Sequence, residues 1–245
     1  MRLDLLLVER GLCTTRQEAQ EVIHKGDVLV NGIAQTKQSK NISDEATVEV
    51  LSTRKYVSRG GEKLAGAFAA VFKHEDDVRA FLKSKKALDV GASTGGFTDF
   101  LLQHGISSVT AVDVGSGQLH ENIKNNSRVT SFEKTDIRDY SSSTKYDVVV
   151  ADLSFIPLRT VFDSILRFGA PGCYFFLLIK PQFEVGKGNT KKGIVKDDGL
   201  TLEVLNEYKK LLLKRGVENL QIRPCVIAGG DGNQENFAIF SLYVL

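Results

Sequence analysis

The chain has 245 residues, of which 42% are hydrophobic and 25% charged, with 32 Lys and Arg against 30 Asp and Glu. Such a composition supplies enough apolar side chains for a hydrophobic core, and a net charge of +2 excludes a histone-like polycation and a fully disordered chain. Any affinity for nucleic acid must therefore come from local clusters of basic residues.

Membrane spans and metal sites are not indicated. The longest uninterrupted apolar run covers residues 173–179, whereas a spanning helix needs about 20 apolar residues. The three cysteines are far apart and odd in number, which fits neither a disulfide framework nor a metal-binding pair. The four histidines have no ligand-like spacing, so we expect no metal. We expect a cytoplasmic protein.

The first fifty residues predict a small module of two helices and a few short strands. Thr15 and Glu18 form a capping box that opens the second helix, and Lys25-Gly26 ends it. Helices are expected over residues 3–10 and 15–24, strands over 28–30, from Ile33 and over 47–51, and a tight turn at Asn31-Gly32. A module of this size is expected to depend on its attachment for stability.

The rest of the chain alternates predicted strands and helices, which is typical of a doubly wound, mostly parallel sheet. The strands are expected over 86–91, 108–113, 128–133, 146–152, 173–179, 217–223 and 237–244, and helices from Glu62 and over 97–104, 157–168 and 200–213. The last strand could insert antiparallel. We expect a front module over residues 1–51, a polar and basic linker over 52–62, and a large domain over 63–245.

A glycine-containing loop follows the first strand of the large domain. Small residues let a ligand approach the backbone at the carboxyl edge of a parallel sheet, and acidic residues follow the next two strands. The spacing of the glycines does not match G-x-G-x-x-G, and no G-K-[ST] follows, so the phosphate-binding loops of nucleotide sites are absent from the sequence. This favours S-adenosylmethionine over a dinucleotide. A simple tight turn is the structural alternative. The candidate cofactor residues are Gly91, Ala92, Ser93, Thr94, Gly95, Gly96, Phe97, Asp113, Asp136 and Asp152.

Lys180 stands directly after a strongly apolar strand, where a buried lysine needs a partner. Lys63, Asp152 and Glu235 each lie next to a loop and are the candidate partners. If the four meet, a Lys180 amine that has lost its proton could orient or deprotonate a ribose hydroxyl for attack on a sulfonium methyl group. The alternative is a lysine that extends to solvent. We interpret Cys225 as a small buried side chain rather than a nucleophile.

Basic residues outside this group are the candidates for RNA contact, because they could neutralise phosphates. A solvated, mixed-charge surface is the alternative for each of them. The loop from Lys187 is expected to be flexible. The candidates are Arg2, Arg16, Lys25, Lys37, Arg54, Lys55, Arg59, Lys187, Lys191 and Lys192.

Seven motifs in order resemble those of the TlyA-type (haemolysin A family) ribosomal RNA 2′-O-methyltransferases. They begin at Arg2, Ala19, Tyr56, Asp89, Ala151, Lys180 and Gly232. The resemblance implies a Rossmann-like class I fold with a seven-stranded, mostly parallel sheet of the FtsJ/RrmJ type. A small α+β alpha-L RNA-binding domain, named after a small-subunit ribosomal protein, would precede it.

The same resemblance implies a Lys-Asp-Lys-Glu catalytic tetrad, which falls on Lys63, Asp152, Lys180 and Glu235. It further implies S-adenosylmethionine as methyl donor and a cytidine ribose of ribosomal RNA or ribosomal subunits as acceptor, with no obligate protein partner. Tyr56 stands where relatives often have Trp. The short N-terminus resembles members that modify only the large subunit.

Two alternatives from other classes remain at this point. A non-catalytic RNA-binding or assembly factor could keep the fold and a bound nucleoside, although the intact tetrad argues against it. A pore-forming haemolysin would need an amphipathic or spanning segment, and the sequence contains none that we recognise.

Overall fold

A computed structural model describes residues 1–13, 15–51, 55–229 and 232–242. The candidate Arg54 and the side chain of Lys25 lie outside the described part. The chain forms two compact units, Met1–Arg54 and Lys55–Leu245. No helix within the described residues is long and apolar enough to cross a membrane.

The first unit packs two helices against a small antiparallel sheet. Its elements are α1 (Leu3–Glu9), α2 (Arg16–Lys25), β1 (Val28–Val30), β2 (Ile33–Gln35) and β3 (Val48–Val50), in the strand order β2-β1-β3. Thr15 accepts the Glu18 amide hydrogen at the start of α2, and Gly26 ends that helix in the left-handed conformation, as predicted. Leu3, Leu7 and Ile23 are fully buried between the layers, so this unit has a core of its own.

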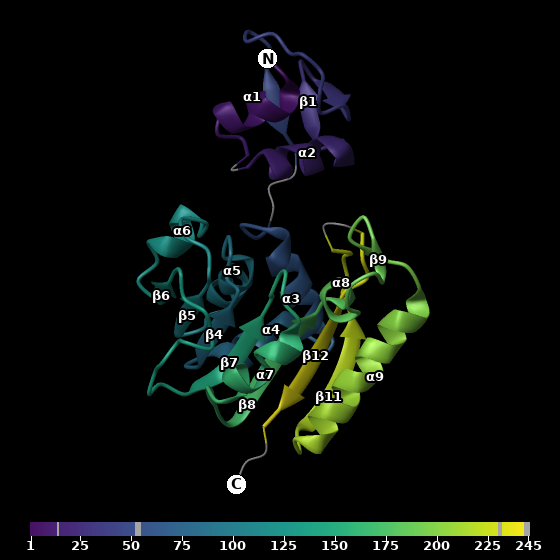
Figure 1. The fold of residues 1–245 in the computed structure, drawn as a ribbon. Coiled ribbons are helices and arrows are strands. Elements are labelled where there is room, and N and C mark those ends of the chain that lie inside the picture. The colour runs from purple at the N-terminus through teal and green to yellow at the C-terminus, as the bar shows by residue number, and fades with distance from the viewer. Residues whose placement is uncertain (14, 52–54, 230–231, 243–245) are drawn as a thin grey trace. The chain divides into compact units, whose positions relative to one another are not determined.

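The second unit is built on a seven-stranded sheet in the order β11-β12-β8-β7-β4-β5-β6 (Figure 1). The strands are β4 (Lys86–Val90), β5 (Ser108–Val112), β6 (Val129–Phe132), β7 (Tyr146–Ala151), β8 (Gly169–Ile179), β11 (Glu218–Pro224) and β12 (Asn236–Ser241). Neighbours from β6 to β8 are parallel, and β12 pairs antiparallel with both β8 and β11. The predicted doubly wound sheet and its antiparallel last strand are confirmed.

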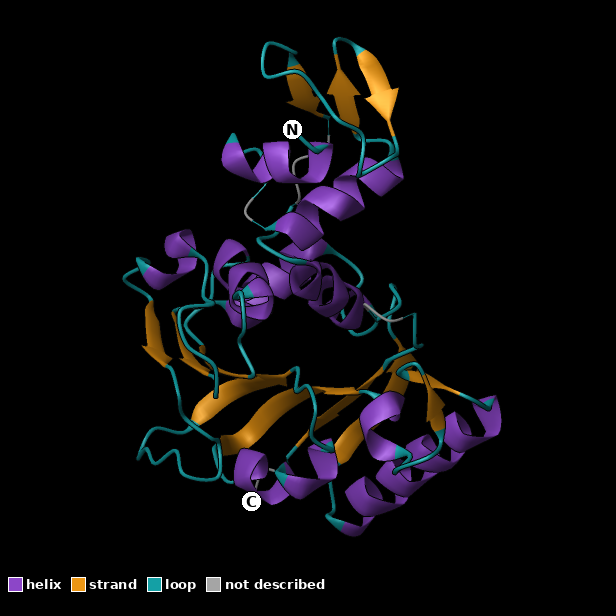
Figure 2. Cartoon of the chain, turned by 45° about the horizontal axis from the view of Figure 1, so that its top comes forward, coloured by secondary structure: helices purple, strands orange, loops and turns teal. Residues whose placement is uncertain are grey.

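Helices cover both faces of this sheet (Figure 2). One face holds α3 (Arg59–Ala69), α4 (Glu75–Leu82), α5 (Gly96–Gln103) and α6 (Glu121–Lys124), and the other holds α7 (Phe162–Leu166), α8 (Pro181–Glu184) and α9 (Asp198–Lys214). Along β8, Phe175 and Leu177 enter one core and Phe176 enters the other. Since both faces are buried, the central strands read as continuous apolar runs.

The start of the second unit differs from the expected linker. Helix α3 begins at Arg59, before the predicted start at Glu62. Tyr56 is buried, its ring 5.7 Å from that of Phe100, and the Val57 amide donates to Asp99 at 2.7 Å. The polar composition of this stretch concealed one apolar anchor that fastens it to α5.

Several local predictions also need correction. The helix expected over 157–168 is split into a 3₁₀ turn, Leu158–Thr160, and α7. Strand β8 begins at Gly169 rather than at residue 173, with a register shift opposite β7. The loop expected to be flexible contains a two-stranded hairpin, β9 (Thr190–Lys191) and β10 (Ile194–Val195). Helices α4, α6 and α8 were not predicted, because short segments carry too weak a periodicity.

Candidate active site

A cavity of about 360 Å³ lies at the carboxyl ends of β4, β5 and β7. The order in which strands are added to the sheet reverses here, since β5 and β6 lie on one side of β4 while β7 and β8 lie on the other. Ligands of open α/β sheets bind at such switch points. Five predicted cofactor residues line the cavity: Gly91, Ser93, Asp113, Asp136 and Asp152.

The remaining candidates of the glycine loop lie elsewhere. Ala92 lines a small neighbouring recess, and Thr94 and Gly95 lead into α5. A Cβ on Gly96 would lie 2.2 Å from Ser58 Oγ, and Phe97 is buried in the core. Position 96 therefore has no room for a side chain, because residues 58–61 pack directly on the start of α5. Gly91 has a positive φ of 80°, and a Cβ there would lie 2.6 Å from the Asp152 carbonyl oxygen.

Internal hydrogen bonds orient the two carboxylates predicted to hold an adenosine. Asp113 accepts the amide hydrogens of Ser93 and Gly115, each at 2.7 Å. Asp136 is paired with Arg138 at 2.6 Å, and the Arg138 hydrogen bond lowers the pKa of the Asp136 carboxyl. A carboxylate has about four lone-pair sites, so both groups keep acceptor positions for ribose hydroxyls or an adenine amine.

A third carboxyl group, that of Asp89, is fully buried on β4, two residues before Gly91. Thr98 donates its hydroxyl to Asp89 Oδ2 at 2.6 Å, whereas Oδ1 has no partner among the described residues. Burial raises the pKa of the Asp89 carboxyl from 3.8 to about 7, against the opposing Thr98 hydrogen bond. Between these values the folded state binds more protons than the unfolded state, so the free energy of unfolding falls as pH rises.

Replacing Asp89 by Asn removes this titration while an amide oxygen still accepts the Thr98 hydroxyl. We expect the free energy of unfolding of Asp89→Asn, measured relative to that of the wild type, to rise by at least ~1 kcal/mol from pH 5 to pH 8. Urea unfolding at the two pH values measures it. The exposed Asp76→Asn is the control and should show no such gain. A stability difference independent of pH would show that Asp89 does not titrate in this range.

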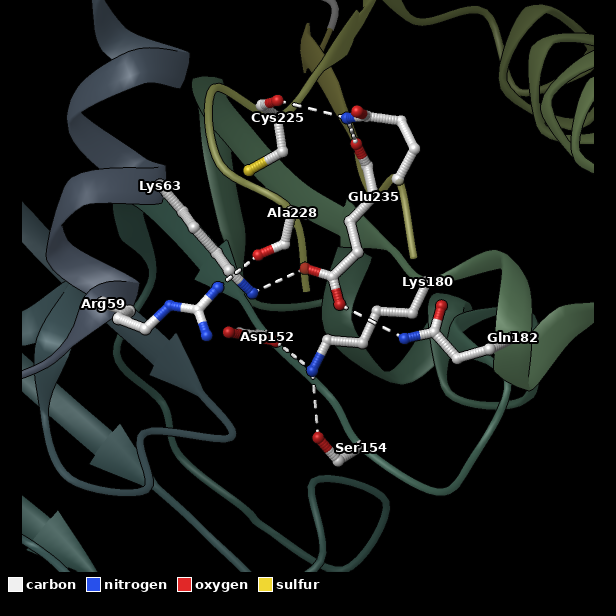
Figure 3. Close-up of polar contacts among 10 residues, drawn as sticks. Arg59, Lys63, Asp152, Ser154, Lys180, Gln182, Cys225, Ala228 and Glu235 are labelled. Atoms are coloured by element: carbon white, nitrogen blue, oxygen red, sulfur yellow. Dashed lines mark hydrogen bonds and ion pairs between the residues drawn. The ribbon is translucent and has the colours of Figure 1, made fainter. Parts of the chain in front are cut away.

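The four residues of the predicted tetrad come together as two ion pairs (Figure 3). Lys63 Nζ lies 2.5 Å from Glu235 Oε2, and Lys180 Nζ lies 2.6 Å from Asp152 Oδ1. They come from α3, the start of β12, the end of β8 and the end of β7. The strand ends bring them to one edge of the sheet, although they are up to 172 positions apart in the sequence.

The two pairs differ in burial. The side chains of Lys63 and Glu235 are 9% and 3% exposed, and those of Lys180 and Asp152 are 11% and 21% exposed. Burial disfavours the Lys63 ammonium, but the nearby Asp152 and Glu235 outweigh it and raise the pKa of Lys63. Lys63 is therefore a fixed positive charge, and the Lys180–Asp152 pair is the one that borders the cavity through Asp152.

Neighbours of the tetrad that the sequence did not single out complete the geometry. Ser154 lines the cavity, and its Oγ accepts a hydrogen from Lys180 Nζ at 2.9 Å. Gln182 donates to Glu235 Oε1 at 3.3 Å. No further hydrogen bond of Lys180 Nζ is found among the described residues, which leaves one position of its nitrogen for substrate. Ser154 and Gln182 each lie two positions after a predicted tetrad residue, and this proximity in the sequence could have identified them.

Phe155 was missed as well. It is 88% exposed at the cavity rim, with a φ of 69° that is rare for a bulky side chain. The ring of Phe183 lies 5.5 Å away. An exposed aromatic side chain on strained backbone costs free energy without stabilising the core, which points to a role in binding.

The basic candidates fall into three groups. Arg2 and Arg16 both bind the fully buried carboxylate of Asp4, each at 2.9 Å. Lys37, Lys55, Lys187, Lys191 and Lys192 are exposed, and Lys55 lies 3.8 Å from Glu75. Arg59 instead donates to the Ala228 carbonyl oxygen (Figure 3) and so connects α3 to the loop before β12. Within the described ranges, no cluster of His, Cys, Asp or Glu could hold a metal ion.

Comparisons with known proteins agree with this architecture. Residues 56–241 match the FtsJ-like methyltransferase family model, and residues 1–48 match the S4 domain model. The chain is 37% identical to "Hemolysin A" of Brachyspira hyodysenteriae, covering 98% of this chain and 99% of that one. It is also 37% identical to "16S/23S rRNA (cytidine-2'-O)-methyltransferase TlyA" of Mycobacterium tuberculosis, covering 96% and 88%.

A solved structure extends the likeness to three dimensions. It is a provisionally named hemolysin from Streptococcus thermophilus, which superposes with a TM-score of 0.75 at 32% identity. The superposition covers 99% of this chain and 88% of that one, so it includes both compact units.

Proposed function

Because this chain belongs to the FtsJ-like methyltransferase family, we propose that it methylates a ribose 2′-oxygen of cytidine in ribosomal RNA, with S-adenosylmethionine as donor. The observation that carries the proposal is the convergence of Lys63, Asp152, Lys180 and Glu235 beside the cavity at the strand ends. The mycobacterial relative, named an rRNA (cytidine-2'-O)-methyltransferase, supports the substrate. Work on ribosomes would place the protein in the cytoplasm.

The cavity fits the donor by its size and its donor set. About 360 Å³ is within the usual range for a small-ligand site. Asp113 would hold the ribose hydroxyls and Asp136 the adenine, while Gly91 lets the ligand approach the backbone. When bound, S-adenosylmethionine supplies a methyl group on a positively charged sulfur.

The residues of this chain would handle the proton of the acceptor hydroxyl. Lys180 Nζ, held between Asp152 and Ser154, is placed to orient the 2′-hydroxyl. As a neutral amine that has released its own proton to solvent, it would accept the hydroxyl proton as the oxygen–methyl bond forms and the sulfur–methyl bond breaks. Asp152 would keep the resulting ammonium in place. Lys63 and Glu235, tied to Gln182, would hold this edge rigid, and alignment of oxygen and methyl would supply much of the rate.

The target nucleotide must leave its stack before its ribose can reach the cavity. The exposed ring of Phe155, beside Phe183, offers a surface on which an unstacked base can lie. Phe155→Ala is expected to weaken RNA binding by about 1–3 kcal/mol, and Phe155→Tyr, which keeps the ring, should stay near the wild type. Equilibrium binding with a labelled RNA fragment measures both. Equal affinities for the Ala and Tyr variants would refute stacking on Phe155.

The front unit would supply RNA affinity of its own. Asp4 holds Arg2 and Arg16 in place from a fully buried position, which keeps two guanidinium groups at a defined surface. Such fixed cations suit structured RNA, where shape and backbone are recognised more than sequence. This assignment of an RNA-binding module rests on the S4 match over residues 1–48.

Transfer of labelled methyl from S-adenosylmethionine to purified large subunits, small subunits and free ribosomal RNA tests the proposal. We expect label in the RNA of the large subunit, and label in the small subunit as well would extend the substrate to both. Binding of S-adenosylhomocysteine without label in any RNA would refute the methylation of ribosomal RNA and favour an RNA-binding assembly factor.

A further inference from the structure

The hairpin formed by β9 and β10 is too short to be stable alone. Lys191 pairs with Ile194 and Thr190 with Val195, so only two residue pairs form the ladder. The turn residues Lys192 and Gly193 have φ values of 51° and 80°, the left-handed pair of a type I′ turn. Isolated hairpins of any length are marginal in water, and this one therefore requires an external attachment.

Asn233 provides that attachment. Asn233 is buried, with only 4% of its surface exposed. The amide oxygen accepts the Val195 amide hydrogen at 3.0 Å, and the amide nitrogen donates to the Gly193 carbonyl oxygen at 2.8 Å. The side chain therefore binds the hairpin at two points, the turn residue Gly193 and the second-strand residue Val195.

Both Asn233 and the hairpin that it binds lie close to residues of the proposed catalytic centre. Asn233 is two residues before Glu235, which pairs with Lys63. The hairpin in turn lies beside α8, whose first residue follows Lys180 (Figure 1). The position of the hairpin is therefore tied to that of Lys180 and Glu235.

The hairpin and its flanks form a strongly basic segment. Residues 187–196 contain four lysines and no acidic residue. Lys196 Nζ donates to the Gly188 carbonyl oxygen within the segment. The side chains of Lys187, Lys191 and Lys192 are exposed, and none forms an ion pair with another described residue. Unpaired lysines on a fixed element suit a chain of phosphates.

We propose that Asn233 is a positioning residue for RNA: it holds the basic hairpin at a fixed place beside Lys180, so that the lysines bind the substrate backbone in register with the target ribose. This inference rests on the proposed function. It assigns Asn233 to the recognition of the substrate backbone, separate from the cofactor and from the chemical step.

Asn233→Ala is the direct test, in the full-length protein with ribosomal subunits. We expect the KM for the subunit to rise at least ~tenfold, and the salt dependence of RNA binding to weaken by up to about 0.7–0.9 in log–log slope for each phosphate that the lysines no longer neutralise. The kcat and the affinity for S-adenosylhomocysteine should stay within about threefold, since the tetrad and the cavity keep their residues.

Two further variants separate this role from a general loss of structure. Gly193→Val leaves residue 233 itself unchanged but strains the turn whose carbonyl oxygen accepts the Asn233 hydrogen bond. It should reproduce the rise in KM, because valine disfavours a positive φ. Replacing Lys187, Lys191 and Lys192 by Gln should raise KM too, and adding Asn233→Ala to that variant should cause little further change, because both changes remove the same interactions with RNA.

The outcomes are distinct. A wild-type protein that transfers no methyl to RNA would defeat the proposed function itself. An active wild type whose Asn233→Ala variant keeps the subunit KM and the salt slope would overturn only this inference. A loss confined to kcat or to cofactor affinity, or full additivity with the lysine variant, would also overturn it by assigning Asn233 to the Glu235 loop alone.

Discussion

Lys180→Ala is expected to lower the rate of methyl transfer by about 10²–10⁴-fold. Lys180 is the basic group held at the cavity by both Asp152 and Ser154, and alanine leaves no group to take the proton of the acceptor hydroxyl. The affinity for S-adenosylhomocysteine should change little, because the residues at the ends of β4 and β5 are untouched. Single-turnover methyl transfer measures the chemical step.

The exposed Lys210 on α9 offers a matched control. Lys210→Ala removes an identical side chain from a position that belongs neither to the tetrad nor to the cavity lining. This variant should transfer methyl at the wild-type rate. If Lys180→Ala kept more than about a tenth of the wild-type rate, another group would have to accept the proton, and the central role of Lys180 would be wrong.

Lys63→Met is expected to destabilise the fold by about 3–5 kcal/mol, because it leaves the Glu235 carboxylate buried without its cation. The double replacement Lys63→Met and Glu235→Met removes both charges and should recover most of that loss, since a buried ion pair is often no more stable than apolar side chains of similar volume. Chemical denaturation followed by circular dichroism measures the free energy of unfolding of all three proteins.

The same variants distinguish stability from activity. We expect the double variant to be folded but inactive, since it lacks two of the four converging groups. A double variant that unfolds as readily as Lys63→Met would show that the loss is caused by packing and not by the unpaired charge. A double variant with wild-type activity would remove Lys63 and Glu235 from the mechanism.

The strand-end residues of the site were predictable because their positions follow from the sheet. An apolar run that ends in Asp113, Asp152 or Lys180 places that side chain at the carboxyl edge once the strands are parallel. The pairing of Lys63 with Glu235 was not predictable from the residues alone, since one lies on a helix and the other at the antiparallel last strand. Their positions next to loops made both residues candidates and the resemblance to a family placed them in one tetrad, but their pairing with each other is seen only in the structure.

The errors fall where local polarity opposes tertiary packing. Lys55 to Gly61 read as a linker, yet the Tyr56 ring packs so closely on Gly61 that an added Cβ would lie 2.3 Å from it. The basic segment from Lys187 read as a flexible loop because a ladder of two residue pairs has no periodicity. Its hydrogen bonds to Asn233 join it to a residue about forty positions later.

The most direct test of the account is the chemical position of the transferred methyl group. Labelled RNA from the methylated subunit is hydrolysed with alkali, which cleaves next to free 2′-hydroxyls only. A methyl group on the ribose oxygen beside Lys180 predicts label in an alkali-resistant dinucleotide that carries cytidine. Label recovered in mononucleotides would place the methyl group on a base and would contradict the proposed chemistry of Lys180.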